Sequence, residues 1–193
     1  MTNDPVHKLS NLVEGARSGN RASMEELASF FYNKIFHMVY SRNVSRMDAE
    51  DLTQEIFLAM SKNLHQLKDT TRFKAWLYRI ALNRIKDFHR KKNFLSLFSL
   101  KPTENTESLG ESHNALGDVM GKEFWRQFHG LTRQMSKKER EVFILRYVDQ
   151  LGIRELAETL KNSESTVKTH LYRALKKFKK APGLRSFLKG NLI

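Results

Sequence analysis

The side chains best suited to chemistry lie near the end of the sequence, in SESTVKTHLYRALKKFKK (163–180). Apolar residues at helical spacing place Val167, Leu171 and Phe178 on one side of a helix. The other side carries cations, hydroxyls and a phenol: Lys168, Thr169, Tyr172, Arg173 and Lys176, with Ser165 and Thr166 at the start of the segment. Such groups neutralise phosphates and donate hydrogen bonds to base edges in the major groove. The pattern indicates a DNA-contacting helix, and the alternative is a solvated basic helix of a bundle.

The residues before this segment predict the elements that would position it. Ser136 and Glu139 have the spacing of a capping box, which opens a helix. Gly152 predicts a turn, and a short helix with one apolar face follows it, ending before a tight KNS turn. Ser163 is placed to cap the last helix. A short helix, a tight turn and a longer amphipathic helix together predict a helix-turn-helix.

A second cationic segment is RFKAWLYRIALNRIKDFHRKK (72–92), with eight basic residues and one acidic residue. Its outer face carries Arg79, Asn83, Lys86 and Arg90 at spacings of four, three and four, which suits a nucleic-acid strand. The polar loop before it holds Lys68, Asp69, Thr70 and Thr71 and could form the wall of a pocket. Trp76 has apolar neighbours at helical spacing, so a core position is favoured over base stacking.

An acidic segment, MDAEDLTQEIF (47–57), contrasts with the rest of the chain, whose formal net charge is +13. Leu52, Ile56 and Met60 share one side of the predicted helix, and the outward side holds Asp51, Gln54, Glu55 and Leu58. Those carboxylates cannot face phosphates of like charge. Three interpretations remain: acidic residues that complement the helix dipole, a metal site, and a docking patch for a basic protein. No helix with matching His or carboxylate residues supports the metal site.

The remaining composition predicts an all-α protein of two small helical domains, because prolines number only three and apolar residues recur at helical spacing. We expect a first domain at 1–93, a flexible acidic linker at 94–118, a helix-turn-helix domain at 119–181 and a tail at 182–193. The absence of cysteine excludes disulfides and thiolate metal ligands, and no cofactor is predicted. No segment predicts a signal peptide or a membrane span, so we expect a cytoplasmic location.

Three segments in order, DAEDLTQEIF, RFKAWLYRIALNRIKDF and REVFILRYVDQLGIRELAETL with STVKTHLYRAL, resemble a sigma factor of bacterial RNA polymerase. The two-domain length is similar to the extracytoplasmic-function (ECF) group. The resemblance implies a transcription initiation factor without catalytic activity, which binds the polymerase core, directs it to promoters and helps to melt promoter DNA.

The resemblance also implies roles for the residues singled out above. Asp51, Gln54 and Glu55 would bind the clamp coiled coil of the β′ subunit. The loop and the following helix would capture a flipped base of the minus-ten element through Lys68, Asp69, Thr70, Thr71, Asn83 and Lys86. The second domain would dock on the β flap and recognise the minus-thirty-five element through Lys168, Thr169, Tyr172 and Arg173. The linker would lie in the active-centre cleft of the polymerase, and an anti-sigma factor is an expected partner.

Some residues depart from the family pattern. Lys161 and Asn162 stand where the helix-turn-helix usually has glycine and an apolar residue, and Ser165 stands where it has glycine. The stretch Phe94–Leu100 is unusually apolar for a linker, and we expect it to pack between the domains or against an anti-sigma factor. The rival interpretation is a free-standing helix-turn-helix regulator whose N-terminal domain oligomerises or binds an effector. The acidic patch and the helix with Asn83 argue against this rival.

Overall fold

The computed structural model describes residues 5–42, 44–98, 130 and 132–179. These residues form seven α-helices and two short 3-10 turns, and among them there is no strand. The chain divides into two compact units, Met1–Glu107 and Ser108–Ile193. The prediction of an all-α fold is confirmed. No helix in the described ranges combines the length and the apolar character that crossing a bilayer requires.

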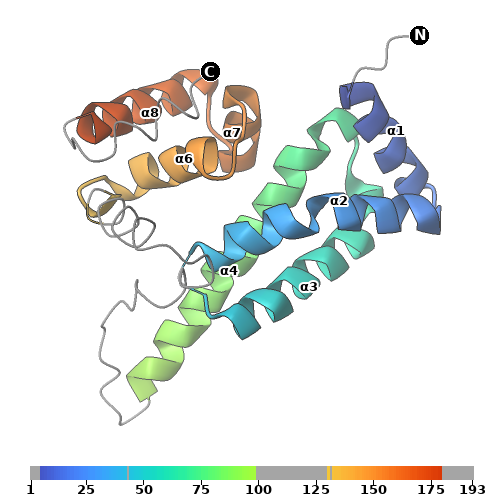
Figure 1. The fold of residues 1–193 in the computed structure, drawn as a ribbon, viewed down its shortest axis with the longest axis horizontal. Helices are drawn as coiled ribbons and strands as arrows, with labels where there is room; N and C mark the ends of the chain where they lie inside the picture. The colour runs from blue at the N-terminus through green and yellow to red at the C-terminus, as the bar shows by residue number, and fades with distance from the viewer. Residues whose placement is uncertain (1–4, 43, 99–129, 131, 180–193) are drawn as a thin grey trace, which may run out of the picture. The chain divides into compact units, whose positions relative to one another are not determined.

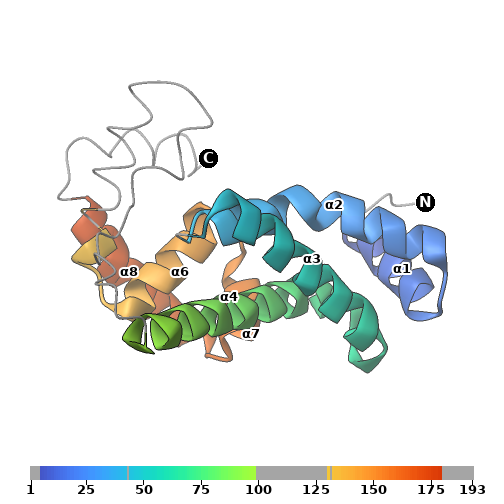
Figure 2. The ribbon, with the colours of Figure 1, turned by 90° about the horizontal axis from the view of Figure 1, so that it is seen from below.

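The first unit consists of α1 (Pro5–Arg17), α2 (Arg21–Tyr40), α3 (Arg46–Asn63) and α4 (Phe73–Phe98), with the 3-10 turns η1 (Leu64–Gln66) and η2 (Thr70–Arg72) between α3 and α4. Helix α3 packs against both α2 and α4 (Figures 1 and 2). The predicted apolar stripes form the core, since these residues are buried: Leu27, Phe31, Ile35 and Met38 of α2, Leu52, Ile56 and Met60 of α3, and Phe73, Leu77, Ala81 and Ile85 of α4.

Side-chain caps mark the starts of α2 and α3. The Asn20 carboxamide oxygen accepts a hydrogen bond from the Ser23 N–H at 3.0 Å, and the Ser45 hydroxyl accepts one from the Asp48 N–H at 3.1 Å. Each cap satisfies a backbone donor that has no partner within its own helix. Gly19, at φ 89°, makes the turn between α1 and α2 with a backbone conformation that favours glycine.

Helix α4 is longer than the sequence predicted. It continues to Phe98, whereas the first domain was expected to end at residue 93. The stretch that looked unusually apolar for a linker begins at Phe94, and as far as residue 98 it belongs to this helix. The rest of the expected linker, 99–118, lies outside the described residues. Trp76 is half-buried, with its ring centroid 6.0 Å from that of Phe73.

The second unit contains α6 (Lys137–Tyr147), α7 (Ile153–Leu160) and α8 (Glu164–Phe178). The predicted capping box is present: the Glu139 N–H donates to Ser136 Oγ at 3.3 Å, and Glu139 Oε2 accepts from the Ser136 N–H at 2.9 Å. The core includes stacked rings of Phe143 and Phe178 with centroids 5.0 Å apart, and both α6 and α7 pack on α8. The predicted sequence of short helix, tight turn and longer helix is confirmed by α7 and α8.

Candidate protein and nucleic-acid interfaces

The outer face of α8 presents the side chains that the sequence singled out. Ser165, Lys168, Thr169, Tyr172, Arg173 and Lys176 are all exposed, and Thr166 is half-buried. The Tyr172 side chain is the most open apolar surface here, with 69% of the residue exposed. Two of these side chains already contact their own helix: Thr169 Oγ1 donates to Ser165 O at 2.9 Å, and Lys168 Nζ lies 3.7 Å from Glu164 Oε2. The face therefore offers cations, one phenol and hydroxyls to a partner on a single helical surface.

The turn between α7 and α8 fixes the angle at which α8 is presented. Lys161 ends α7 in the left-handed conformation, at φ 53° and ψ 45°, and the Asn162 N–H donates to Ala157 O at 2.9 Å. The Ser163 hydroxyl then accepts from the Thr166 N–H at 3.1 Å, as predicted, and starts α8. Lys161, at the position where the family usually has glycine, therefore has the backbone conformation that glycine adopts most easily.

An ion pair between a half-buried lysine and a buried glutamate holds the far end of α8 against the start of α6. Lys177 Nζ donates to Glu139 Oε2 at 2.7 Å and to Gln134 O at 3.1 Å. The hydrogen bond from Lys177, followed by that from the Ser136 N–H, holds the pKa of the Glu139 carboxyl below its ordinary value. The carboxylate therefore caps α6 and binds α8 at once. Sequence reasoning identified the cap but not the partner, because Lys177 is 38 residues away.

The outer face of α4 carries the predicted cations and amide. Asn83, Lys86 and Arg90 are exposed, and Arg79 is half-buried. Arg90 Nη2 forms an ion pair of 3.1 Å with Asp87, the acid of this segment. His89 Nε2 lies 3.0 Å from Arg42 O, which ties α4 to the end of α2, and burial lowers the pKa of this imidazole. This contact fixes α4, which carries the exposed face, against the segment that follows α2.

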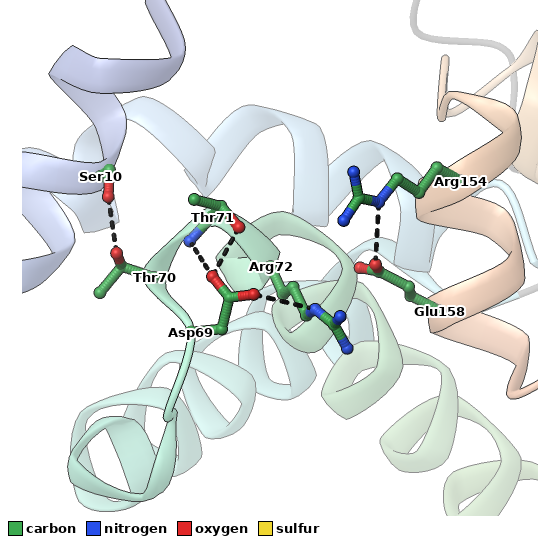
Figure 3. Close-up of polar contacts among 7 residues, drawn as sticks. All are labelled: Ser10, Asp69, Thr70, Thr71, Arg72, Arg154 and Glu158. Carbon is green, nitrogen blue, oxygen red and sulfur yellow. Dashed lines mark hydrogen bonds and ion pairs between the residues drawn. The ribbon is translucent and has the colours of Figure 1, made fainter.

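The predicted polar loop is a compact hydrogen-bonded turn that leads into α4 (Figure 3). Asp69 Oδ1 accepts from the Thr71 N–H at 3.0 Å and from the Thr71 hydroxyl at 2.5 Å, and Asp69 Oδ2 pairs with Arg72 Nε at 3.0 Å. These bonds hold the pKa of Asp69 below its ordinary value, the Thr71 hydroxyl contributing most. Thr70 Oγ1 lies 2.6 Å from Ser10 Oγ of α1, so it faces the protein, while Lys68 is exposed.

The predicted docking residues lie on the solvent-exposed side of α3. Asp51, Gln54, Glu55 and Leu58 are exposed, and within the described part of the chain their side chains have no hydrogen bond or ion pair. The other acids of the segment have local partners that explain them. Asp48 Oδ2 accepts from the Ser45 hydroxyl at 2.6 Å, and Glu50 pairs with Arg46 at 3.1 Å.

Sequence reasoning missed Met47, which is 72% exposed at the start of α3. Met47, Asp51, Gln54 and Leu58 recur at spacings of four, three and four, which is the spacing of a coiled-coil seam. The two apolar side chains stand at the ends of this seam, and the polar pair lies between them. The spacing alone could have found it. We call these four residues the α3 stripe.

The metal-site interpretation of the acidic segment has no support in the described ranges, where no three His, Asp or Glu side chains gather closely enough to hold an ion. Helix-dipole complementation accounts for Asp48, which lies in the first turn of α3. It does not account for Glu55 or for the exposed Leu58. The α3 stripe therefore has the properties of a surface for a helical protein partner.

Comparison with known proteins places both units in one family. Residues 19–94 match the model of sigma-70 region 2, and residues 125–178 match that of sigma-70 region 4. The chain is 31% identical to a probable RNA polymerase sigma factor of Haemophilus influenzae over 144 residues, which cover 65% of this chain and 72% of that protein. It is 26% identical to the ECF sigma factor SigW of Bacillus subtilis, over 87% of this chain and 93% of SigW.

Among solved structures, the fold is similar to that of CnrH in complex with the cytosolic domain of CnrY. The TM-score is 0.65 at 22% identity, over 89% of this chain and 95% of CnrH. The two matched regions, in this order, do not favour a free-standing helix-turn-helix regulator. This chain belongs to the ECF group of bacterial RNA polymerase sigma factors, which direct promoter-specific transcription.

Proposed function

We propose that the chain binds the polymerase core through the α3 stripe and Glu55. The observation that carries this proposal is that a chain of charge +13 exposes Asp51 and Glu55 next to Leu58, with no internal partner among the described residues. A basic coiled coil complements this surface in charge, and the spacing of the α3 stripe matches helix-on-helix packing. The partner that fits is the clamp coiled coil of the β′ subunit.

We further propose that the loop and the outer face of α4 bind the displaced strand of the minus-ten element. Lys68, Asn83 and Lys86 are exposed on this surface, where cations hold phosphates and the carboxamide of Asn83 can hydrogen-bond a base edge. Capture of an unstacked base offsets the cost of opening the duplex, which is a few kcal/mol per step. The chain thereby supports melting without catalytic chemistry of its own.

The outer face of α8 is proposed to contact the minus-thirty-five element as duplex. Lys168, Arg173 and Lys176 would bind phosphate or guanine, and Tyr172 and Thr169 would add short-range contacts. The second unit would also dock on the β flap. An anti-sigma factor is the proposed regulator, because CnrH, which has a similar fold, was solved with the cytosolic domain of another protein. The proposed site of action is the cytoplasm, where polymerase and chromosome meet.

Transcription with purified core polymerase and genomic DNA tests the function. Promoter-specific transcripts should require both this chain and the core. Glu55→Lys should abolish core binding, whereas the control Glu26→Lys, the same charge reversal at an exposed position of α2, should not. Lys168→Ala and Arg173→Ala should spare core binding and weaken promoter use by about 1–3 kcal/mol for a base contact. Core binding by Glu55→Lys at parental strength would remove α3 from the docking surface.

A further inference from the structure

Helix α1 precedes the segment that matches sigma-70 region 2, which begins at residue 19, and the proposed function assigns it no role. It nevertheless packs against η1, which precedes the polar loop at 68–71, and against η2, which contains Thr70 and Thr71 of that loop. We call residues 68–71 the base-capture loop, after the role proposed for them above. Two side chains of α1 bind this loop and the residue that precedes it. Arg17 Nη1 donates to Leu67 O at 3.0 Å, and Ser10 Oγ lies 2.6 Å from Thr70 Oγ1 (Figure 3).

These two contacts bracket the loop. Leu67 precedes Lys68 and Asp69, and Thr70 follows them, so α1 holds the chain on both sides of these two residues. The bonds from Asp69 to Thr71 and Arg72 are local and fix the shape of the turn only. The contacts with α1 are the long-range ones, because their partners are 50 and 60 residues apart in the sequence.

The Arg17 guanidinium is itself fixed in place. Its Nη2 forms an ion pair of 2.7 Å with Glu14 Oε1, one turn earlier in α1, while Nη1 reaches the Leu67 carbonyl. The guanidinium is planar and presents several donors at fixed angles, so the first contact orients the second. The Leu67 side chain is buried, which anchors the carbonyl that receives the bond.

The attachment of α1 does not depend on these polar contacts. Val13 and Ala16 are buried, and α1 packs along α2. Gly15 allows a close approach of the two helices, because a Cβ there would lie 2.6 Å from Ser23 Oγ and 3.2 Å from its Cβ. Removing the Ser10 or Arg17 side chain should therefore leave α1 in place and free only the loop.

We propose that α1 positions the base-capture loop, with Ser10 and Arg17 as positioning residues. Ser10 would act through Thr70, whose hydroxyl lies against α1. A loop that is ordered before DNA arrives loses less conformational freedom on binding and therefore binds more tightly. This inference rests on the proposed role of the loop and of Asn83 in binding the displaced strand.

The experiment uses holoenzyme assembled from the full chain and core polymerase. The probe is a fluorescent single-stranded decamer, selected by the parental holoenzyme from a randomised pool. The variants are Ser10→Ala, Arg17→Ala and Arg17→Lys. The matched control is Arg21→Ala, because Arg21 forms an ion pair with Glu25 that lies within α2, away from the loop.

Loss of the charged donor in Arg17→Ala should weaken decamer binding about tenfold, and loss of the neutral bond in Ser10→Ala about threefold. Arg17→Lys should recover part of the loss, since an ammonium can reach the carbonyl but lacks the second fixed donor. Core binding should stay within about twofold of the parent, because Ser10 and Arg17 lie on α1, outside the docking surface proposed for α3. Hydrogen exchange of the amides at 67–72 should accelerate in Arg17→Ala and not in Arg21→Ala.

Two further variants, Lys68→Ala and Asn83→Ala, separate the two ways in which this inference can fail. If both bind the decamer as the parent does, the proposed function of the loop and α4 is wrong, and the inference falls with it. If they lose affinity while the Ser10 and Arg17 variants match Arg21→Ala, only the positioning role is wrong. Faster loop exchange in Arg17→Ala without loss of decamer binding would also overturn it, because a purely structural contact gives that result.

Discussion

Truncation of Leu58 to alanine tests whether the α3 stripe is the docking surface for the polymerase core. Leu58 is 61% exposed in the free chain, so a partner helix can still remove about three-fifths of its surface from water. Full burial of a leucine side chain contributes about 1.5–3 kcal/mol. Docking should therefore gain about 1–2 kcal/mol from Leu58, and Leu58→Ala should raise the Kd for core about five- to thirtyfold.

The same exposure predicts that the free chain tolerates the substitution. An exposed side chain makes few contacts that the folded state could lose, so the free energy of unfolding should change by less than about 0.5 kcal/mol. Phe94→Ala is the matched control, because Phe94 is 60% exposed but lies on α4. It should leave core binding unchanged, which would separate loss of the α3 stripe from general loss of exposed apolar surface.

Salt separates the apolar part of docking from the charged part. At 0.1 M salt the Debye length is about 10 Å, and it falls to about 3 Å at 1 M. The loss caused by Glu55→Gln should therefore shrink as salt rises, whereas the ratio between Leu58→Ala and the parent should stay constant. Fluorescence anisotropy of the labelled chain, titrated with core at both salt concentrations, measures both. A Leu58→Ala variant within about twofold of the parent Kd at both concentrations would refute the docking assignment, since that is under 0.5 kcal/mol.

Two predictions concern the second unit. Lys177→Met leaves the buried Glu139 carboxylate without its ion pair, and because the Lys177 side chain is 39% exposed we expect a loss of about 1–2 kcal/mol, measured by hydrogen exchange in α6 and α8. The pKa of Glu139 is lowered in the folded chain, so its stabilisation is present above the ordinary glutamate pKa and is lost as pH falls through the folded value. In Lys177→Met the folded pKa of Glu139 should lie closer to the ordinary value, so the loss of stability on acidification should be smaller and complete at a higher pH. An unchanged pH profile would contradict the assignment. Lys161→Gly should raise the free energy of unfolding of this unit by about 0.5–1 kcal/mol in the same measurement, because Lys161 has the left-handed backbone conformation that glycine adopts without strain. A lower free energy of unfolding would show that the lysine side chain stabilises the unit by more than its backbone strain destabilises it.

Local patterns predicted the helices and their caps well. Ser136 with Glu139, and Ser163 before α8, are signals contained within four residues, and the structure has both caps. The apolar stripes also predicted which side of each helix is buried, since helical geometry alone decides that. The outward direction of Asp51 follows from the burial of Leu52 and Ile56 by the same geometry.

Contacts between distant residues could not be predicted in this way. The bonds from Ser10 to Thr70 and from Lys177 to Glu139 join residues 60 and 38 positions apart, and no periodicity relates them. The basic helical segment was also predicted to end at residue 92, because the stretch after residue 93 was assigned to the linker in spite of its apolar residues, whereas α4 continues to Phe98. The conformation of Lys161 is a third example. A lysine in place of glycine argues against a left-handed residue in the sequence, but Lys161 has this conformation in the structure, because tertiary packing can override a local preference.

The arrangement of α3 and α4 explains how the two proposed interfaces, one acidic and one basic, can lie on one small unit. The two helices pack against each other, with Ile56 of α3 and Ala81 of α4 in the shared core. The apolar face of each helix points toward that core. The opposite face of α3, with Glu55, and the opposite face of α4, with Asn83, therefore point toward solvent on two separate helices. With the proposed roles, protein and DNA would bind this unit at the same time, and neither set of charges would face a partner of like charge. A single helix carrying both patterns would bring carboxylates toward phosphates, a repulsion that grows as water is excluded from the interface.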